Sequence, residues 1–579
     1  MFNYILESSK DDFKILNIND GSKSILLGSR YNEKENCRKF VDKINIKDGE
    51  SIIIIIGIAT GNYIDYLLSK LGYGNKLIIL EPDHNIYNLY MELNRDSKTI
   101  KDRRLFIANY KNKNEVFKVL DEELDKSYIM NITYSVFTNY SKIYEEQLNG
   151  AIEGINEYSN LVKTLRNTNI RFSKKVTNNY FYNFKEVAKG INGNILKNTF
   201  KGKTAVIVSS GPSLSKNINE LKKYQNEILI IAAARSLKEL LINGIRPHFI
   251  CALDPGDIMY NIMKESLNVD IPMITIEQTN YKLLMQYKGP KIFFLNSFKD
   301  TFSKLMKERY ESLSTEGSVA HLATAFAAHL GVENIILVGQ DLAFTDLKYH
   351  SEESSNNKLL NRDAFINKNE LFTVEGNVEE KVFTNTRFII FKNWFENFIK
   401  QNEKIKFINS TEGGAKIYGT EVMPLKNSIE KHAKELKELK ELYIDIYENL
   451  INKSKVTTGV NEKLIKTFKD LLKDSYKGIE FSEKMISYYN GNMNLNIKYI
   501  EKTLDEIDDA LNSNFEVCHL LNLSGYKKFE AIQLDENYRE KIGETYKEAG
   551  VRLGKKSLEV YKVYVEIIEE IIEKINSTM

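Results

Sequence analysis

The sequence predicts a multidomain α/β protein: a Rossmann-like N-terminal domain, a central parallel-sheet domain and an all-α C-terminal domain. Short apolar runs alternate with helical patterns up to about residue 425, as in parallel sheets covered by helices. Beyond that point strand signals almost cease, and apolar residues recur at the steps of packed helices. We expect domains at 1–150, 201–425 and 426–579, with a helical connector over 151–200.

The composition is that of a globular chain and excludes several classes of protein. Hydrophobic residues make up 42% and charged residues 28%, which argues against intrinsic disorder. The net charge is only +2, so bulk basicity gives no sign of a nucleic-acid partner. Three widely spaced cysteines exclude a CxxC unit. Without a leader pattern or a run of ~18 apolar residues, we expect a cytoplasmic protein with no membrane partner.

The first domain has the order of a dinucleotide-type βαβ unit. A β-branched run at 51–56 precedes a turn with Gly57 and Gly61, a helical pattern and a second strand at 76–80 that ends in Glu81. The full GxGxxG pattern is absent, so a structural role for this turn is favoured over a working nucleotide site.

The connector is expected to be helical over 162–172 and 180–187. Strands of the central parallel sheet are expected at 204–208, 228–232, 248–253, 272–276, 291–295, 334–338 and, late in the domain, 404–408.

In the C-terminal domain two apolar stripes follow helical spacing, and the end at 561–575 is again helical. The stripes consist of Leu436, Leu439, Tyr443, Ile446 and Leu450, and of Ile500, Leu504, Ile507 and Leu511. They predict a helical bundle or hairpin.

The strongest local motif is the turn after the strand at 204–208. Its backbone N–H groups, the following helix N-terminus and the hydroxyls of Ser209, Ser210 and Ser213 would form an anion cradle around Gly211 and Pro212. No Walker-type lysine follows, which disfavours an ordinary ATPase. A plain strand-to-helix turn is the alternative.

A second motif places Asp254 and Asp257 after the strand at 248–253, on the edge where open α/β sheets bind ligands. Asp254 could contact a ribose, act as a base, or hold Mg²⁺ together with Asp257. The alternative is an Asx-type turn before Pro255 and Gly256.

Three further segments supply candidate residues. Thr315, Gly317 and Ser318 precede an Ala-rich helix, in which His321 and His329 are expected to be packing residues. Gln340 and Asp341 end the strand at 334–338, and Tyr349 and His350 follow in a polar loop. Glu412, Gly413 and Gly414 lie in a glycine-rich loop after the last strand.

Several of these motifs together resemble the motility-associated factor (Maf) glycosyltransferases. The segments at 209–214, 253–255, 339–344, 349–350 and 409–415 match that family's pattern in order and spacing. The resemblance implies a cytoplasmic bacterial enzyme that glycosylates flagellin for flagellum assembly and motility. It also implies a CMP-activated nonulosonic acid as donor, of the pseudaminic or legionaminic type, and Ser or Thr hydroxyls of flagellin as acceptors.

The central domain is similar, more distantly, to bacterial sialyltransferases with a GT-A-like Rossmann core. Gly-Pro-Ser-Leu at 211–214, Thr-x-Gly at 315–317 and Gly-x-Asp at 339–341 match their motifs. Ser210 and small residues near Ala233 stand in place of two asparagines. No histidine lies at 382–384, where the catalytic histidine of that family falls, so that base cannot be carried over.

From this resemblance we assign His350 as the general base, with Asp254 and Glu412 as rivals, and Tyr349 as the phosphate stabiliser. A nucleotide-sugar pocket is expected from Ser209, Ser210, Gly211, Pro212, Ser213, Thr315, Gly317, Ser318, Gln340, Asp341, Gly413 and Gly414. Since a CMP-sugar leaves as a monophosphate ester, no metal and no cofactor beyond the substrate are expected. The C-terminal helices would dock flagellin.

Two alternatives remain open at this stage. The central domain also resembles archaeal pterin pyrophosphokinases, in which Asp254 and Asp257 would hold Mg²⁺. The other alternative is a non-catalytic flagellin-binding module whose nucleotide site is idle.

Overall fold

The computed structural model describes residues 2–577 apart from 20, 22, 47–50, 73, 125–131, 316, 345–370, 434–436, 453–458, 493, 514 and 542. The chain forms two compact units, each built from separate segments. Unit 1 comprises 1–173, 473–511 and 525–566, and unit 2 comprises 174–472, 512–524 and 567–579. The segment 426–579 therefore contributes to both units.

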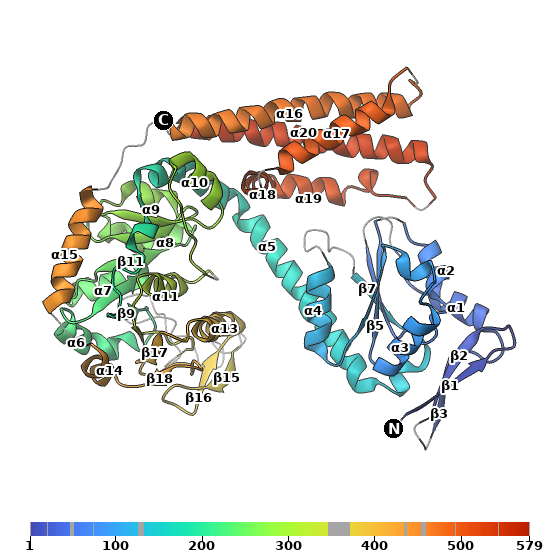
Figure 1. Cartoon of the computed structure of the whole chain (residues 1–579), viewed down its shortest axis with the longest axis horizontal. Coiled ribbons are helices and arrows are strands. Elements are labelled where there is room, and N and C mark those ends of the chain that lie inside the picture. Colours follow the sequence, from blue (N-terminus) through green and yellow to red (C-terminus); the bar gives the residue numbers. More distant parts are fainter. Residues whose placement is uncertain are drawn as a thin grey trace. The chain divides into compact units, whose positions relative to one another are not determined.

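Unit 1 contains a parallel sheet that includes β5 and β7 (Figure 1). The sheet has four strands in the order β6-β5-β4-β7. Its strands are β4 (Ile52–Ile56), β5 (Lys76–Glu81), β6 (Leu105–Asn109) and β7 (Ile132–Val136). They alternate with α2 (Ile64–Ser69), α3 (His84–Leu93) and α4 (Lys113–Glu123). The βαβ unit predicted for the first domain is confirmed. The sequence analysis missed an antiparallel sheet of β1 (Asn3–Ser8), β2 (Lys14–Asn19) and β3 (Ser24–Leu27), which α1 (Glu33–Val41) follows.

Long helices complete unit 1. They are parts of α5 (Glu145–Lys189), α16 (Val460–Tyr489) and α20 (Tyr546–Ser577), with α17 (Ile497–Asn512) and α19 (Tyr526–Leu534). The apolar stripe of α17 is buried, as predicted. Helices α16 and α20 meet closely, because a Cβ atom at Gly478 would lie 2.6 Å from the Tyr561 ring. The Tyr561 hydroxyl then donates to Asp508 on α17 at 2.7 Å.

Unit 2 is built on a nine-stranded sheet in which every strand pair is parallel. The order is β18-β17-β14-β9-β10-β11-β12-β13-β8. Its strands are β8 (Ile191–Asn192), β9 (Thr204–Val208), β10 (Leu229–Ala233), β11 (Phe249–Ala252), β12 (Met273–Ile276), β13 (Lys291–Phe294), β14 (Asn334–Val338), β17 (Lys406–Asn409) and β18 (Glu421–Val422). All seven predicted strands are present within two residues at each end; β8 and β18 were not predicted.

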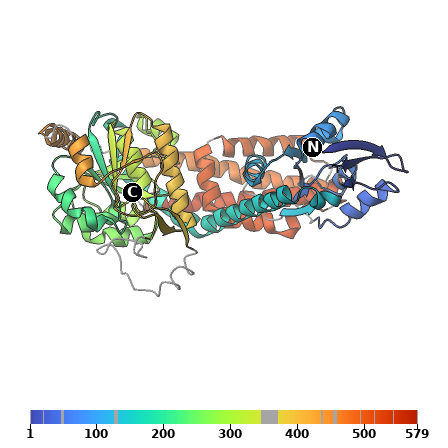
Figure 2. The same cartoon turned by 90° about the horizontal axis from the view of Figure 1, so that it is seen from below.

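Helices cover both faces of this sheet (Figure 2). They include α6 (Leu214–Tyr224), α7 (Leu237–Ile242), α8 (Asp257–Met263), α9 (Tyr281–Gln286), α10 (Lys299–Met306), α11 (Val319–His329), α13 (Thr386–Gln401), α14 (Leu425–His432) and α15 (Lys437–Asn452). A hairpin of β15 (Phe372–Glu375) and β16 (Lys381–Thr384) and the helix α18 (Phe515–Ser524) complete the unit.

The strand order defines a switch point between β9 and β14. From β9 the chain builds one half of the sheet through β10 to β13, and it then returns to place β14 on the other side of β9. Ligands of open α/β sheets bind at the carboxyl ends of the strands at such a point.

For the first predicted heptad stripe, the helical-bundle interpretation is wrong. Ile446 and Leu450 of α15 are buried in the core of unit 2, and the Tyr443 hydroxyl donates to the carbonyl of His248 at 2.9 Å. An apolar stripe needs a partner surface but does not specify which one. Here the partner is the α/β domain, not another helix of the bundle.

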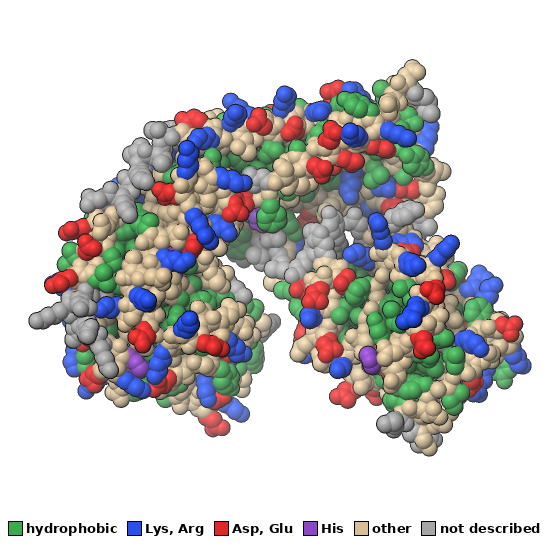
Figure 3. Space-filling view, viewed as in Figure 1, with side chains coloured by type: hydrophobic (Ala, Val, Ile, Leu, Met, Phe, Trp, Pro, Cys, Tyr) green, Lys and Arg blue, Asp and Glu red, His purple; other side chains and the backbone are tan. Residues whose placement is uncertain are grey.

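On the face visible in Figure 3, acidic and basic side chains are interspersed over each unit, in keeping with the balanced charge of the sequence. Within the described residues, no helix combines the length and the apolar character that crossing a bilayer requires.

Candidate functional site

Three loops predicted from separate motifs meet at the carboxyl ends of β9, β14 and β17. The Ser209 hydroxyl donates to Oε1 of Gln340 at 2.6 Å, which joins the β9 loop to the β14 loop. The backbone N–H of Gln340 donates to the Thr411 hydroxyl at 3.1 Å, which joins the β14 loop to the β17 loop. The fold thus brings together, at the switch point, loops that lie up to about 200 residues apart in the sequence.

Two glycines allow these loops to cross. A Cβ atom at Gly211 would lie 2.0 Å from Oδ2 of Asp341 and 2.4 Å from the carbonyl of Gly339. At Gly414, whose φ is +77°, it would lie 2.2 Å from the carbonyl of Asp341. Any larger residue at either position would push the β14 loop away. These two glycines, which were predicted as site residues, therefore allow loops of the protein itself to approach each other closely.

The carboxylate of Asp341 lies at the turn after β9, where the sequence predicted a bound anionic ligand. Its carboxylate accepts the Ser213 hydroxyl at 2.7 Å and the Ser213 N–H at 3.2 Å, directly before α6. A negative charge at a helix N-terminus is favourable. Ser209, Ser213, Gln340 and Asp341 are all buried. The half-buried Ser210, Gly211 and Pro212 lie in the same turn.

Glu412 links the β17 loop to α6. Its Oε1 accepts the Asn217 side-chain amide at 3.0 Å, and its carbonyl accepts the Lys216 ammonium at 2.9 Å. Glu412 is half-buried, whereas Gly413 and Gly414 beside it are buried. The carboxylate therefore lies at the rim of the converging loops.

Asp254 follows β11 and is exposed. Its Oδ1 accepts the N–H of Gly256 at 2.6 Å, which is the Asx-type turn that the sequence offered as the alternative. Asp257 is ion-paired with the ammonium groups of Lys175 at 2.8 Å and Lys282 at 3.4 Å. The Lys175 hydrogen bond holds the pKa of Asp257 below its usual value. Among the described residues, no group of three or more His, Cys, Asp or Glu side chains is placed to hold a metal ion.

Thr315, Gly317 and Ser318 lie just before α11. Gly317 has φ +76°, and a Cβ atom there would meet nothing within 4 Å. The Ser318 side chain makes no capping bond to α11. Thr315 and Ser318 are half-buried, so this segment has hydroxyls and free space.

Tyr349 and His350 lie outside the described residues. The segment 382–384, which lacks the expected histidine, belongs to β16 and lies beside the residues that follow Asp341. The Thr384 hydroxyl donates to the carbonyl of Leu342 at 2.8 Å, and the N–H of Phe344 donates to the carbonyl of Phe383 at 2.8 Å.

The two helix histidines are packing residues, as predicted. His321 stacks on Trp394 with ring centroids 4.0 Å apart, and burial lowers its pKa to about 3. His329 packs against Phe294, with centroids 5.0 Å apart.

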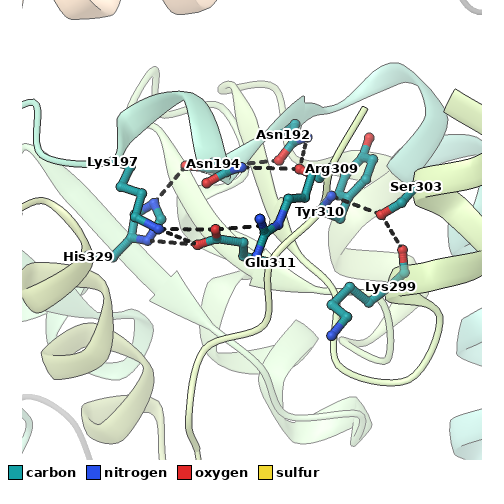
Figure 4. A network of polar contacts seen from close by, with 10 residues as sticks. Asn192, Asn194, Lys197, Lys299, Ser303, Arg309, Tyr310, Glu311 and His329 are labelled. Carbon is teal, nitrogen blue, oxygen red and sulfur yellow. Dashed lines mark hydrogen bonds and ion pairs between the residues drawn. The ribbon is translucent and has the colours of Figure 1, made fainter. Parts of the chain in front are cut away.

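His329 also belongs to a polar network around Glu311, drawn in Figure 4. The Glu311 carboxylate is ion-paired with Lys197 at 3.1 Å and with Arg309 at 3.9 Å. It also lies 3.8 Å from Nδ1 of His329, whose pKa is lowered by burial. Arg309 and Glu311 also line a cavity of about 720 Å³ beside α10. The network joins β8, α11 and the segment after α10, and it includes none of the residues predicted from the motifs.

One further arginine escaped the sequence analysis. Arg235 belongs to η4 (Ala234–Ser236), which directly follows β10 and therefore lies at the carboxyl edge of the sheet next to β9. The signal that could have identified Arg235 is a charged residue between small residues at the end of a strand, Ala233-Ala234-Arg235-Ser236.

In unit 1, the glycine turn of the βαβ unit is filled by the protein itself. A Cβ atom at Gly57 would lie 2.5 Å from the Tyr140 ring. The Tyr140 hydroxyl donates to Glu81 at 2.6 Å and accepts the N–H of Ala59 at 2.8 Å. Glu81 is fully buried, and burial raises its pKa to about 8. These contacts support the structural interpretation of the turn.

Comparison with known proteins gives one match to a family model and one similar solved structure. Residues 178–347 match the family described as 6-hydroxymethylpterin diphosphokinase MptE-like. The solved structure of a Maf glycosyltransferase from Magnetospirillum magneticum AMB-1 is similar to 99% of this chain and 92% of that chain, with a TM-score of 0.60 and 13% sequence identity. No curated protein sequence matches the chain. The resemblance to the Maf glycosyltransferases is thus confirmed at the level of the fold, over nearly the whole chain.

Proposed function

We propose that this protein is a glycosyltransferase that moves a nonulosonic acid from a CMP-activated donor to Ser or Thr hydroxyls of flagellin. The sugar is of the pseudaminic or legionaminic type, and the reaction takes place in the cytoplasm before flagellum assembly. The observation that carries this proposal is the meeting of the β9, β14 and β17 loops at the switch point. Its setting is a fold shared with a Maf glycosyltransferase over 99% of the chain.

The proposed chemistry follows from the donor. When the sugar leaves, negative charge grows on the CMP phosphate, and hydrogen-bond donors near the leaving oxygen stabilise it. A base takes the proton of the acceptor hydroxyl, a contribution of about 10²–10⁴-fold. His350 stays our proposed base and Tyr349 our proposed phosphate stabiliser. Of the two rivals, Asp254 is exposed, whereas Glu412 is half-buried and bonded to Asn217.

The family match over 178–347 favours a second candidate, a Mg²⁺-dependent pterin diphosphokinase. That reaction would use Asp254 and Asp257 as metal ligands. The residues present do not fit this role, because Asp257 is already paired with the ammonium groups of Lys175 and Lys282.

The nucleotide that is released separates these candidates. We expect CMP to be released from CMP-pseudaminic or CMP-legionaminic acid when flagellin is added, with EDTA present throughout. AMP release from ATP and a hydroxymethylpterin, dependent on Mg²⁺, would contradict the transferase and establish the kinase. Neither release, with flagellin shown to bind, would favour the non-catalytic module.

A further inference from the structure

The segment η4 is fixed against the end of β9. The buried Ser236 hydroxyl lies 3.0 Å from the carbonyl of Val208 and 2.8 Å from the carbonyl of Ala233. Val208 is the last residue of β9, so the loop that starts at Ser209 begins beside η4. Arg235 is therefore held next to the loop that the sequence predicted to bind the nucleotide.

Arg235 is a half-buried cation that forms no ion pair with any described residue. Within the described part of the chain, it makes no hydrogen bond and no ion pair, although a guanidinium carries five N–H donors. Burial lowers the pKa of Arg235, the charge of Asp254 raises it, and the charge of Arg387 lowers it again. Desolvating a charge without a partner costs free energy, so such a group is rarely kept for stability alone.

Asp254 is the acid whose charge acts on Arg235, and the two side chains form no ion pair among the described residues. Asp254 directs Oδ1 to the N–H of Gly256. A second cation, Arg387, is exposed at the start of α13, its guanidinium 5.4 Å from the centre of the Phe391 ring. Arg387 lies near enough to Arg235 for its positive charge to lower the pKa of Arg235.

We propose that Arg235, assisted by Arg387, is the oxyanion-binding group of the donor site and takes the phosphate or the sugar carboxylate of the CMP-nonulosonic acid. The inference rests on the proposed function, because both anions belong to that donor. It also revises the role of the β9 turn. With Asp341 at the N-terminus of α6, positive charge for the donor comes from Arg235 beside the turn and from Arg387, not from the helix end.

Arginine suits this role for a chemical reason. Its planar fork can donate two parallel hydrogen bonds to one phosphate or carboxylate, which a lysine ammonium cannot reproduce. Charge-assisted bonds of this kind are the strong ones in proteins. A guanidinium kept half-buried and unpaired beforehand is also desolvated in advance of binding.

Titration calorimetry of the full-length protein with cytidine, CMP and the intact CMP-sugar tests the assignment. We expect Arg235→Met to weaken binding of the anionic ligands about 10- to 100-fold and to leave cytidine binding unchanged. Arg235→Lys should lie between Arg235→Met and the wild type. The matched control is Arg309→Met, which removes an equally charged, exposed side chain outside the site and should bind like the wild type.

The melting temperature of each unliganded variant is measured in parallel. Because Arg235 has no hydrogen-bond or ion-pair partner among the described residues, Arg235→Met should melt no lower than the wild type. Weaker binding of CMP identifies the phosphate as the anion; weaker binding of the CMP-sugar alone identifies the carboxylate. Unchanged binding of both ligands by Arg235→Met, with the wild type active, would overturn the inference and leave the transferase standing. A wild type that binds neither ligand would overturn both.

Discussion

Asp341 shows how one residue decides what a strand-end turn can do. An acid at the end of a parallel strand is well placed to contact a ligand, and the sequence predicted that use. In the structure its carboxylate accepts the N–H and the hydroxyl of Ser213, 128 positions earlier in the chain. The residue type was visible in the sequence, but its partner was not, because only the crossing of two loops brings them together.

The same crossing predicts that Gly211 tolerates no side chain. In Gly211→Ala the new Cβ would meet Asp341 at 2.0 Å and the Gly339 carbonyl at 2.4 Å. We expect the free energy of unfolding of unit 2 to fall by about 3 kcal/mol, measured by chemical denaturation. Gly317→Ala is the control: it has φ +76° and open space around it, so only backbone strain of about 1 kcal/mol is expected. Equal losses in the two variants would refute the crowding at Gly211.

His321 predicts a pH dependence of stability. Burial lowers its pKa in the folded protein to about 3, below the value of 6.5 expected when unfolded. Between these values the unfolded chain binds the proton and the folded chain does not, so this residue costs stability as the pH falls below about 6.5. We expect His321→Phe, which can still stack on Trp394, to lose less stability than the wild type between pH 7 and pH 5. Parallel denaturation curves would exclude this role.

At the scale of elements, the buried parallel strands could be predicted and their lateral neighbours could not. The strand β9 reads Thr-Ala-Val-Ile-Val and is buried along its whole length, which gives a strong signal. The missed β1 and β2 contain polar residues and lie in a small antiparallel sheet, where the pattern is weaker. The short β18 has two residues, too few for any periodic signal.

Helix α15 carries a prediction of its own. Leu450 is 1% exposed in the core of unit 2, whereas Ile451 beside it is 50% exposed. We expect Leu450→Ala to reduce the free energy of unfolding of unit 2 by roughly 2–5 kcal/mol, because it leaves a cavity. The matched control Ile451→Ala should cost less than about 1 kcal/mol. If both variants unfold like the wild type, α15 does not belong to this core.

At the scale of the whole molecule, the two units differ in what surrounds their predicted glycine-containing turns. The nine-stranded sheet of unit 2 gathers the loops predicted to bind the donor. In unit 1, the similar βαβ turn is closed by Tyr140. The sequence could not show that the turn in unit 1 is filled by the protein itself, because Tyr140 lies about 80 positions from the turn.

Glu81 makes the stability of unit 1 sensitive to pH in the opposite direction from His321. Burial raises its pKa to about 8, above the usual 4.5. As the pH rises from 4.5 to 8 the unfolded chain releases the proton while the folded chain keeps it, so stability is lost. We expect the wild type to lose stability relative to Glu81→Gln over this range, measured by denaturation at pH 5 and pH 8. A difference that does not change with pH would contradict the raised pKa.

The central claim is tested most directly by the intact mass of unmodified flagellin after incubation with this protein and CMP-nonulosonic acid in EDTA. The account predicts a mass gain in steps of one nonulosonic acid, located by peptide mapping on Ser or Thr. It also predicts a smaller gain with Arg235→Met and an unchanged gain with Arg309→Met. No gain under any condition, with the donor intact and flagellin bound, would contradict the claim that this chain is the transferase.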